Sequence, residues 1–141
     1  MSVPAVLDIV NNWPPLAAMV TDGTQVKVYP DTVPEGVAMP YIAYLLSTVQ
    51  PIAALNGYPD ADYVRLSFEC YAKERADALT LADALRDAFD HGGKNGRPLG
   101  YLITGMLEQY EPETRSYFVA MEWGLWQGRN DTPGGIAPDL P

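Results

Sequence analysis

The segment from Tyr63 to Phe89 constrains the fold most, because the spacing of its apolar residues changes from alternation to helical spacing. Alternation places four apolar residues on one face of its first half: Val64, Leu66, Phe68 and Cys70. Such a pattern is typical of a β-strand with one buried face. Helical spacing aligns another set in the second half: Ala78, Leu81, Ala82, Leu85, Ala88 and Phe89. The segment therefore predicts a half-buried strand followed by an amphipathic helix that packs back on the sheet.

The remaining segments predict one more helix and further strands. The helix begins near Ser2 and extends to about Asn12, where Pro14-Pro15 ends or kinks it. The strands are expected at Gln25–Tyr29, Tyr41–Val49, Leu99–Tyr110 and Ser116–Gln127. The predicted fold is α+β, a single and mostly antiparallel sheet with two helices packed on it, in the order α-β-β-β-α-β-β.

The last predicted strand, Ser116–Gln127, carries large side chains on both faces. Tyr117, Val119, Met121, Trp123 and Leu125 lie on one face, with Phe118 and Trp126 on the other. We expect such a strand to be covered on both sides, either by helices or by a neighbouring subunit. Residues 1–128 are expected to form one domain, followed by a flexible Pro/Gly-rich tail at 129–141.

Composition narrows the function classes. The chain has 141 residues and 48% hydrophobic content, enough for a core, and a net charge of −9 without a basic cluster. Binding of nucleic acid through phosphate neutralisation is therefore not expected. The single cysteine, Cys70, excludes an internal disulfide, and its place on the apolar face predicts a buried thiol in a reducing cytoplasm. No signal peptide and no membrane span are expected.

Candidate catalytic groups have simpler interpretations. His91 with Asp87 or Asp90 could act as a base with its orienting acid, but His91 sits where a helix end would place it. Glutamates around the turn at Glu111–Arg115 could attract a cation, yet they lack the spacing of a calcium loop. Zinc ligands and a nucleophile motif are absent from the sequence. We assign no catalytic, cofactor-binding or metal-binding residue and expect a protein that is not an enzyme.

Aromatic residues indicate an interaction surface more strongly. The chain has nine Tyr and three Trp, and some of them must lie partly exposed on strands and loops. Tyr and Trp favour protein–protein contacts because they bury a large area at low entropic cost. The candidate interface residues are Tyr58, Tyr101, Tyr110, Tyr117 and Trp126. The alternative is that they are ordinary sheet aromatics with solvated hydroxyl groups.

The order of several short motifs resembles a family of tailed-phage and prophage proteins. The motifs are Val28-Tyr29-Pro30, Met39-Pro-Tyr-Ile-Ala-Tyr44, Leu55-Asn-Gly57, the strand Val64–Ala72 and Tyr110-Glu-Pro-Glu113. In this order and spacing, from about residue 3 to residue 127, they are similar to the tail completion proteins of long-tailed phages. These are also called tail terminator or tail-to-head joining proteins.

The resemblance implies a structural role. Such a protein forms a ring, usually a hexamer, on the last disc of the tail tube, ends tube polymerisation and joins tail to head. Its implied partners are copies of itself, the tail tube protein and a head-completion or connector protein. Its implied location is the head-proximal end of the virion tail, after assembly in the cytoplasm of the host bacterium. It implies no cofactor, no catalytic residue and no contact with a membrane.

DNA would pass through the lumen of such a ring without sequence-specific binding. An acidic wall would not trap phosphates, so we hypothesise that some carboxylates face the channel. The candidates are Asp60, Asp62, Glu69, Glu108, Glu111 and Glu113.

Three other functions stay open from the sequence. One is a protein-binding module that uses an exposed sheet edge or aromatic patch. Another is a different head–tail connector or a tail-assembly chaperone. A small enzyme is the weakest alternative, and loss of an activity on changing His91 or Cys70 would support it.

Overall fold

The computed structural model describes residues 6–51 and 61–128, and at 48–51, 61–62, 94 and 126–128 it describes the backbone only. The helices in these ranges are α1 (Val6–Asn11), α2 (Pro14–Val20) and α3 (Arg75–His91), with a 3-10 turn at Lys94–Gly96. The strands are β1 (Thr21–Asp22), β2 (Gln25–Val26), β3 (Val28–Pro30), β4 (Tyr41–Pro51), β5 (Ala61–Ala72), β6 (Tyr101–Glu111) and β7 (Ser116–Gly128).

A five-stranded sheet forms the centre of the fold, with the strand order β3-β4-β5-β7-β6. β3 pairs with β4 in parallel, and the other three pairings are antiparallel. β5 lies beside β7 and is paired with it over its whole length, from Ala61↔Gly128 to Ala72↔Tyr117. The short edge strand β3 reaches only Ile42–Tyr44 of β4. The α+β class and the mostly antiparallel sheet predicted from the sequence are confirmed.

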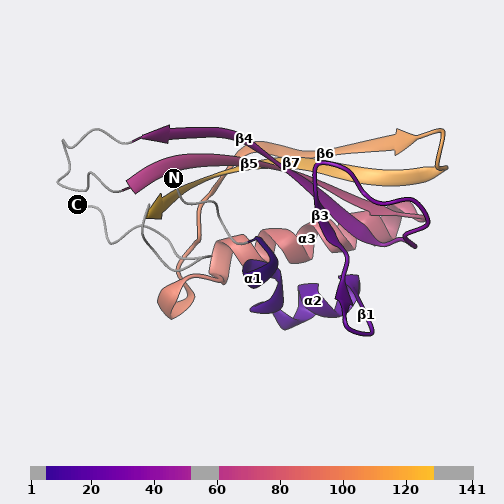
Figure 1. The fold of residues 1–141 in the computed structure, drawn as a ribbon, viewed down its shortest axis with the longest axis horizontal. Coiled ribbons are helices and arrows are strands. Elements are labelled where there is room, and N and C mark those ends of the chain that lie inside the picture. Colours follow the sequence, from indigo (N-terminus) through magenta and orange to yellow (C-terminus); the bar gives the residue numbers. More distant parts are fainter. Residues whose placement is uncertain (1–5, 52–60, 129–141) are drawn as a thin grey trace.

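All three helices lie on the same side of this sheet, and no described helix covers its other side (Figure 1). The core lies between the sheet and α3, whose apolar stripe is buried as predicted. Trp123 of β7 is fully buried there, and its ring stacks on Phe89 of α3 with centroids 4.8 Å apart. Phe68 of β5 contacts Phe89 edge-on at 5.4 Å. Burial of these rings accounts for much of the hydrophobic stabilisation.

The structure corrects the predicted order at the N-terminus. Pro14 and Pro15 do not only end the first helix, because they also occupy the first positions of α2. Proline is tolerated there because the first turn of a helix leaves backbone N–H groups without intrahelical partners. α2 buries Leu16 and Val20, so three helices rather than two lie on this side of the sheet, with α1 and α2 packed against α3.

The predicted single strand Gln25–Tyr29 is also divided. Gln25 and Val26 pair with β1 across the turn at Gly23, whose φ is +63°. These two short strands form a hairpin that is separate from the main sheet. The next residues join the main sheet as β3. The division occurs at Lys27, whose N–H donates to the carbonyl of Val20 while its own carbonyl accepts from Ile42.

Candidate functional site

The side of the sheet opposite the helices forms an open face. Cross-strand pairs place Ala43, Glu69 and Ala120 in one row across β4, β5 and β7. The next row contains Leu45, Ser67, Glu122 and, from β6, Thr104. Because side chains alternate along a strand, these residues point away from the core that α3 covers.

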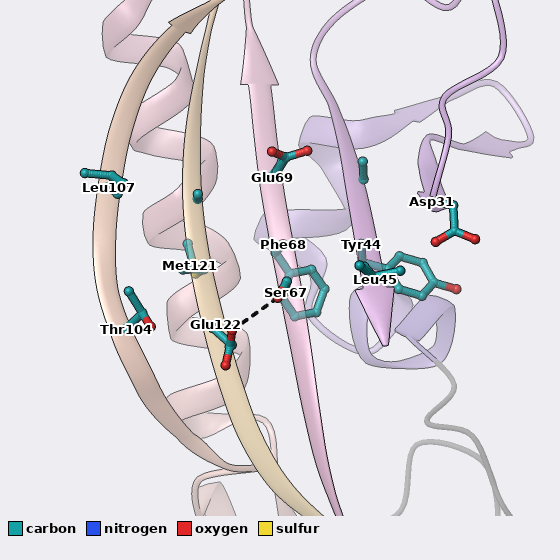
Figure 2. A pocket seen from close by; sticks show the side chains of 12 residues that line it. Asp31, Tyr44, Leu45, Ser67, Phe68, Glu69, Thr104, Leu107, Met121 and Glu122 are labelled. Atoms are coloured by element: carbon teal, nitrogen blue, oxygen red, sulfur yellow. Dashed lines mark hydrogen bonds between the residues drawn. The ribbon is translucent and has the colours of Figure 1, made fainter. Parts of the chain in front are cut away.

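A hollow of about 410 Å³ lies on this open face. Small side chains at Ala43, Ser67 and Ala120 form its floor, while Leu45 and Leu107 stand on opposite sides. These two leucines are 51% and 54% exposed, which is unusual for large apolar residues. Figure 2 shows the hollow from the open side, with α3 behind the strands. An exposed apolar hollow of this kind is typical of an interaction surface.

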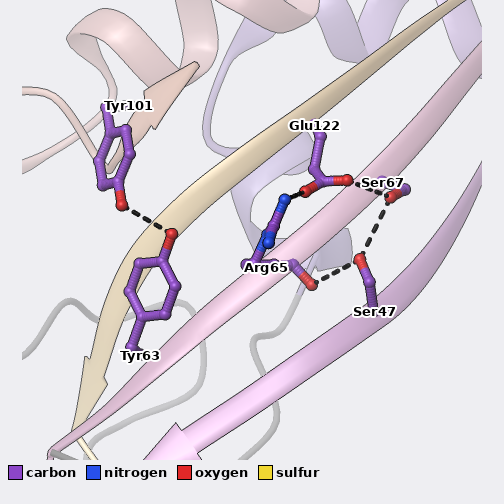
Figure 3. Close-up of polar contacts among 6 residues, drawn as sticks. All are labelled: Ser47, Tyr63, Arg65, Ser67, Tyr101 and Glu122. Carbon is purple, nitrogen blue, oxygen red and sulfur yellow. Dashed lines mark hydrogen bonds and ion pairs between the residues drawn. The ribbon is translucent and has the colours of Figure 1, made fainter. Parts of the chain in front are cut away.

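A polar network crosses the floor of the hollow toward one end of the sheet (Figure 3). The guanidinium of Arg65 forms an ion pair with Glu122, whose other oxygen accepts a hydrogen bond from Ser67 at 3.3 Å. Ser47 donates to the carbonyl of Arg65 at 3.2 Å and also contacts the Ser67 hydroxyl at 3.2 Å. The network links β4, β5 and β7 and neutralises one of the carboxylates on the open face.

An aromatic cluster covers the other end of the open face. The ring of Tyr71 lies 5.2 Å from that of Tyr41 and 4.9 Å from that of Phe118. The Tyr71 hydroxyl donates to Glu69 at 3.2 Å. Burial and the neighbouring carboxylate of Glu69 together raise the pKa of Tyr71 well above its ordinary value. Phe118 is buried by this cluster, so β7 is covered at this position without a helix.

Alkaline pH is expected to destabilise the protein through two groups on β5. Burial raises the pKa of the Cys70 thiol above its ordinary value of 9.0, and that of Tyr71 is raised above 10.0. In the unfolded chain both groups lose their protons at lower pH than in the native state, so deprotonation stabilises the unfolded state. The free energy of unfolding, measured with urea, should therefore decrease from pH 9 upward and more steeply above pH 10.

Two variants separate the contributions. Cys70→Ala should remove the part of the slope that begins near pH 9. Tyr71→Phe should reduce the part that begins near pH 10, to which the raised pKa values of Tyr41, Tyr44 and Tyr63 also contribute. Both variants lose some stability at every pH. The readout is therefore the slope of the free energy of unfolding against pH, and not its value at any one pH. An unchanged slope in both variants would contradict the burial of these groups.

The structure describes the side chains of three of the five candidate interface aromatics. Tyr101 and Tyr110 lie on β6, each 50% exposed, and the Tyr101 hydroxyl donates to that of Tyr63 at 2.6 Å. Tyr117 instead packs against the core and lies 5.0 Å from Tyr110, ring to ring. Trp126 belongs to β7, but its side chain is outside the description, and Tyr58 lies outside the described residues.

The candidate channel acids do not form one group. Glu69 and Glu111 lie on the open face, near Tyr71. Glu108 lies on the helix side, where Arg75 of α3 donates to it at 2.5 Å. Glu113 lies in the β6–β7 turn, and its backbone N–H donates to Glu111. Asp62 is described by its backbone alone, and Asp60 lies outside the described residues.

The described residues do not bring together a catalytic arrangement around the groups considered above. Cys70 is fully buried on the helix side of β5, and His91 lies exposed at the end of α3. No cluster of three His, Cys, Asp or Glu side chains that could hold a metal ion occurs in residues 6–51 and 61–128. None of the helices formed by these residues has the length and apolarity of a membrane span.

Sequence reasoning did not identify the hollow. Its floor is composed of alanine and serine residues from three strands, which carry no motif. One signal was available, because Leu45 and Leu107 occupy positions on their strands where alternation with the core residues calls for a polar side chain.

Together, the fold and the open face define an α+β protein with a hollow of mixed apolar and acidic lining on the described sheet. A family model described as Tail completion protein gp17 matches residues 4–118, so the chain belongs to this family of phage tail completion proteins. It is therefore a structural protein of the phage tail class.

Solved structures agree with the fold. Eleven chains match, among them a chain in the structure "Virion of native gene transfer agent (GTA) particle". That chain is 21% identical, with a TM-score of 0.56, and the match covers 85% of this chain and 89% of that one. At this identity the likeness concerns the fold. A comparison with curated proteins found no match.

Proposed function

We propose that this protein completes the phage tail by capping the tail tube, ending its polymerisation and joining the tail to the head. The observation that carries the proposal is membership of the tail completion family over residues 4–118. The proposed partners are copies of itself in a ring, most simply a hexamer, the tail tube protein and a head-completion or connector protein. The proposed place is the head-proximal end of the virion tail, reached by assembly in the cytoplasm of the host.

The shape of the domain supports a role that depends on surfaces. A completion protein must present different surfaces to the tube, to the head and to its neighbours in the ring, because a ring contact joins two unlike patches. One side of the sheet carries the three helices, and the other carries no described helix (Figure 1). This role requires no catalysis, so we assign no catalytic residue.

The acidic residues of the open face fit a channel that DNA traverses. Glu69 and Glu111 both lie on that face within electrostatic reach of Tyr71, and the chain as a whole has a net charge of −9. Repulsion of phosphates would let DNA pass without binding. We propose that these two residues face the channel, whereas Glu108 is held by Arg75 on the other side of the sheet.

The test of the proposal is genetic. Deletion of the coding sequence from a phage that carries it should leave heads without tails and free tails of uncontrolled length, seen by electron microscopy. A plasmid copy of the full chain should restore joined particles. Normal-length tails attached to heads in the deletion strain would contradict the proposal.

Particle composition separates a completion protein from a tail-assembly chaperone. Mass spectrometry of purified particles should find this chain, because a completion protein stays in the virion and a chaperone leaves. Its absence from infectious particles would favour the chaperone.

A further inference from the structure

Two strand edges of the five-stranded sheet are open with respect to the described residues. Within the described residues, β6 pairs with β7 alone, and the Leu45–Pro51 part of β4 pairs with β5 alone. β3 covers β4 only at Ile42–Tyr44. An open edge presents a row of backbone N–H and C=O groups that can pair with another strand.

The exposed large apolar residues concentrate on these two edges. Five such residues occur among the described side chains, and four of them are on β4 or β6: Leu45, Tyr101, Leu107 and Tyr110. Soluble proteins usually protect open edges with charges, prolines or bulges, because apolar edges invite pairing. β6 is bulged between Leu102 and Leu107, but its pairing with β7 is regular from Leu107 to Glu111. The regular part of β6 is thus both open and partly apolar.

The strand directions allow the two edges to pair with each other in different copies. β4 is antiparallel to β5, β5 to β7 and β7 to β6, so β4 and β6 run in opposite directions. A second copy rotated about an axis along the strands keeps its strand directions. Its β4 would therefore lie antiparallel to β6 of the first copy, with both sets of helices on the same side. The open edges lie at opposite ends of the sheet, which permits the contact to repeat.

We propose that Leu107–Gln109 of β6 pairs antiparallel with Leu45–Ser47 of β4 in a second copy of this chain, with Leu107 opposite Ser47 and Gln109 opposite Leu45. The contact joins two unlike patches and leaves one of each free, so its repetition closes a ring or extends a filament. Burial of Leu45 and Leu107 against the neighbouring copy contributes the apolar part of the association. The closure of the ring on a tail rests on the proposed function, whereas the strand contact itself does not.

Disulfide trapping tests the contact directly. The variants are Leu45→Cys and Ser47→Cys on β4, and Leu107→Cys and Gln109→Cys on β6. All four residues are exposed, and the native Cys70 is fully buried, so background reaction should be low. Within one copy β4 and β6 are three strand spacings apart, about 14 Å, which exceeds the reach of a disulfide. Any disulfide between these strands must therefore join two copies.

Equimolar mixtures of one β4 variant and one β6 variant are oxidised, both as concentrated purified protein and in particles from complemented cells. The two copies carry tags of different size, so mixed and like dimers separate on a gel. If copies collide at random, about half of the cross-linked dimers are mixed. If β4 of one copy contacts β6 of another, the mixed share should be roughly twice that, because the contact joins two unlike patches. Leu7→Cys, on α1, is the matched control, because Leu7 is 45% exposed away from both edges.

The pairs of cysteine variants also report the relative direction of the two strands in the contact. Leu45→Cys with Gln109→Cys and Ser47→Cys with Leu107→Cys should be trapped together in an antiparallel contact. Strong trapping of both Leu45→Cys with Leu107→Cys and Ser47→Cys with Gln109→Cys would indicate parallel strands and overturn the proposal. Like dimers, or mixed dimers no more abundant than with Leu7→Cys in both solution and particles, would overturn it as well.

The trapping experiment tests the strand contact, and the deletion experiment tests the proposed function, so either proposal can be contradicted without the other. Trapped rings together with normal tails in the deletion strain would leave the contact standing and remove the proposed function. Defective tails in the deletion strain with no trapping in complemented particles would leave the function standing and remove the contact.

Discussion

Replacement of Trp123 by alanine should lower the free energy of unfolding by about 3–5 kcal/mol, the range for truncation of a fully buried aromatic residue. Trp123 has no exposed surface, and its ring stacks on Phe89 with centroids 4.8 Å apart. Its indole N–H donates to the sulfur of Met121 at 3.1 Å. The variant loses the buried area and leaves a cavity between β7 and α3 that neighbouring strands cannot easily fill.

Urea unfolding followed by circular dichroism measures this effect, and the thermal midpoint should fall by roughly 10–20 °C. Tyr110→Ala is the matched control, because Tyr110 is 50% exposed and lies on the neighbouring strand. The Tyr110→Ala variant should lose much less stability than the Trp123→Ala variant. A loss below about 1 kcal/mol for Trp123→Ala, with cooperative unfolding retained, would show that α3 does not pack on β7 as described.

The second large effect is expected at Gly100, immediately before β6. A Cβ atom at this position would lie 2.3 Å from the carbonyl oxygen of Gly124 and 3.0 Å from the Cβ of Leu125. Both neighbours belong to the central strand β7, whose backbone cannot move without disturbing its pairing with β5. Gly100→Ala should therefore cost about 1–3 kcal/mol through overpacking.

Gly105, within β6, provides a control of the same residue type. No heavy atom lies within 4 Å of a Cβ built at Gly105, which is in the bulged part of β6. Gly105→Ala should be neutral, or stabilise by about 0.4–1 kcal/mol through the lower entropy of the unfolded chain. Equal losses from the two substitutions in urea unfolding would mean that β6 does not start against β7 at this point.

The strand–helix segment shows what local pattern can predict. Alternation at Val64–Cys70 and helical spacing at Ala78–Phe89 depend only on which residues must be buried, and the structure buries these residues. The N-terminal part shows where pattern reasoning fails. Proline reads as a helix breaker, but whether it ends a helix or begins one depends on the packing of the residues that follow, here Leu16 and Val20.

The site shows a similar division. The candidate interface aromatics come from residue type alone; Tyr101 and Tyr110 are each 50% exposed, and their place in an interface stays a prediction. Tyr117 is different, since its position in β7 places its ring against the core. The hollow could not be predicted, because it requires the order in which β4, β5, β7 and β6 lie side by side. That order depends on long-range pairing, which leaves no local signal in a single sequence.

By itself, the sequence determined the α+β class, most strand positions, the amphipathic helix and the resemblance to the tail completion family, because each depends on local spacing of residue types. Only the tertiary structure decided which face of the sheet and which strand edges are left uncovered by residues 6–51 and 61–128. It also separated Glu69 and Glu111 on the open face from Glu108 on the helix side. The physical reason is that helices, once packed, cover one face of a sheet, and only the strand order shows which side chains remain exposed.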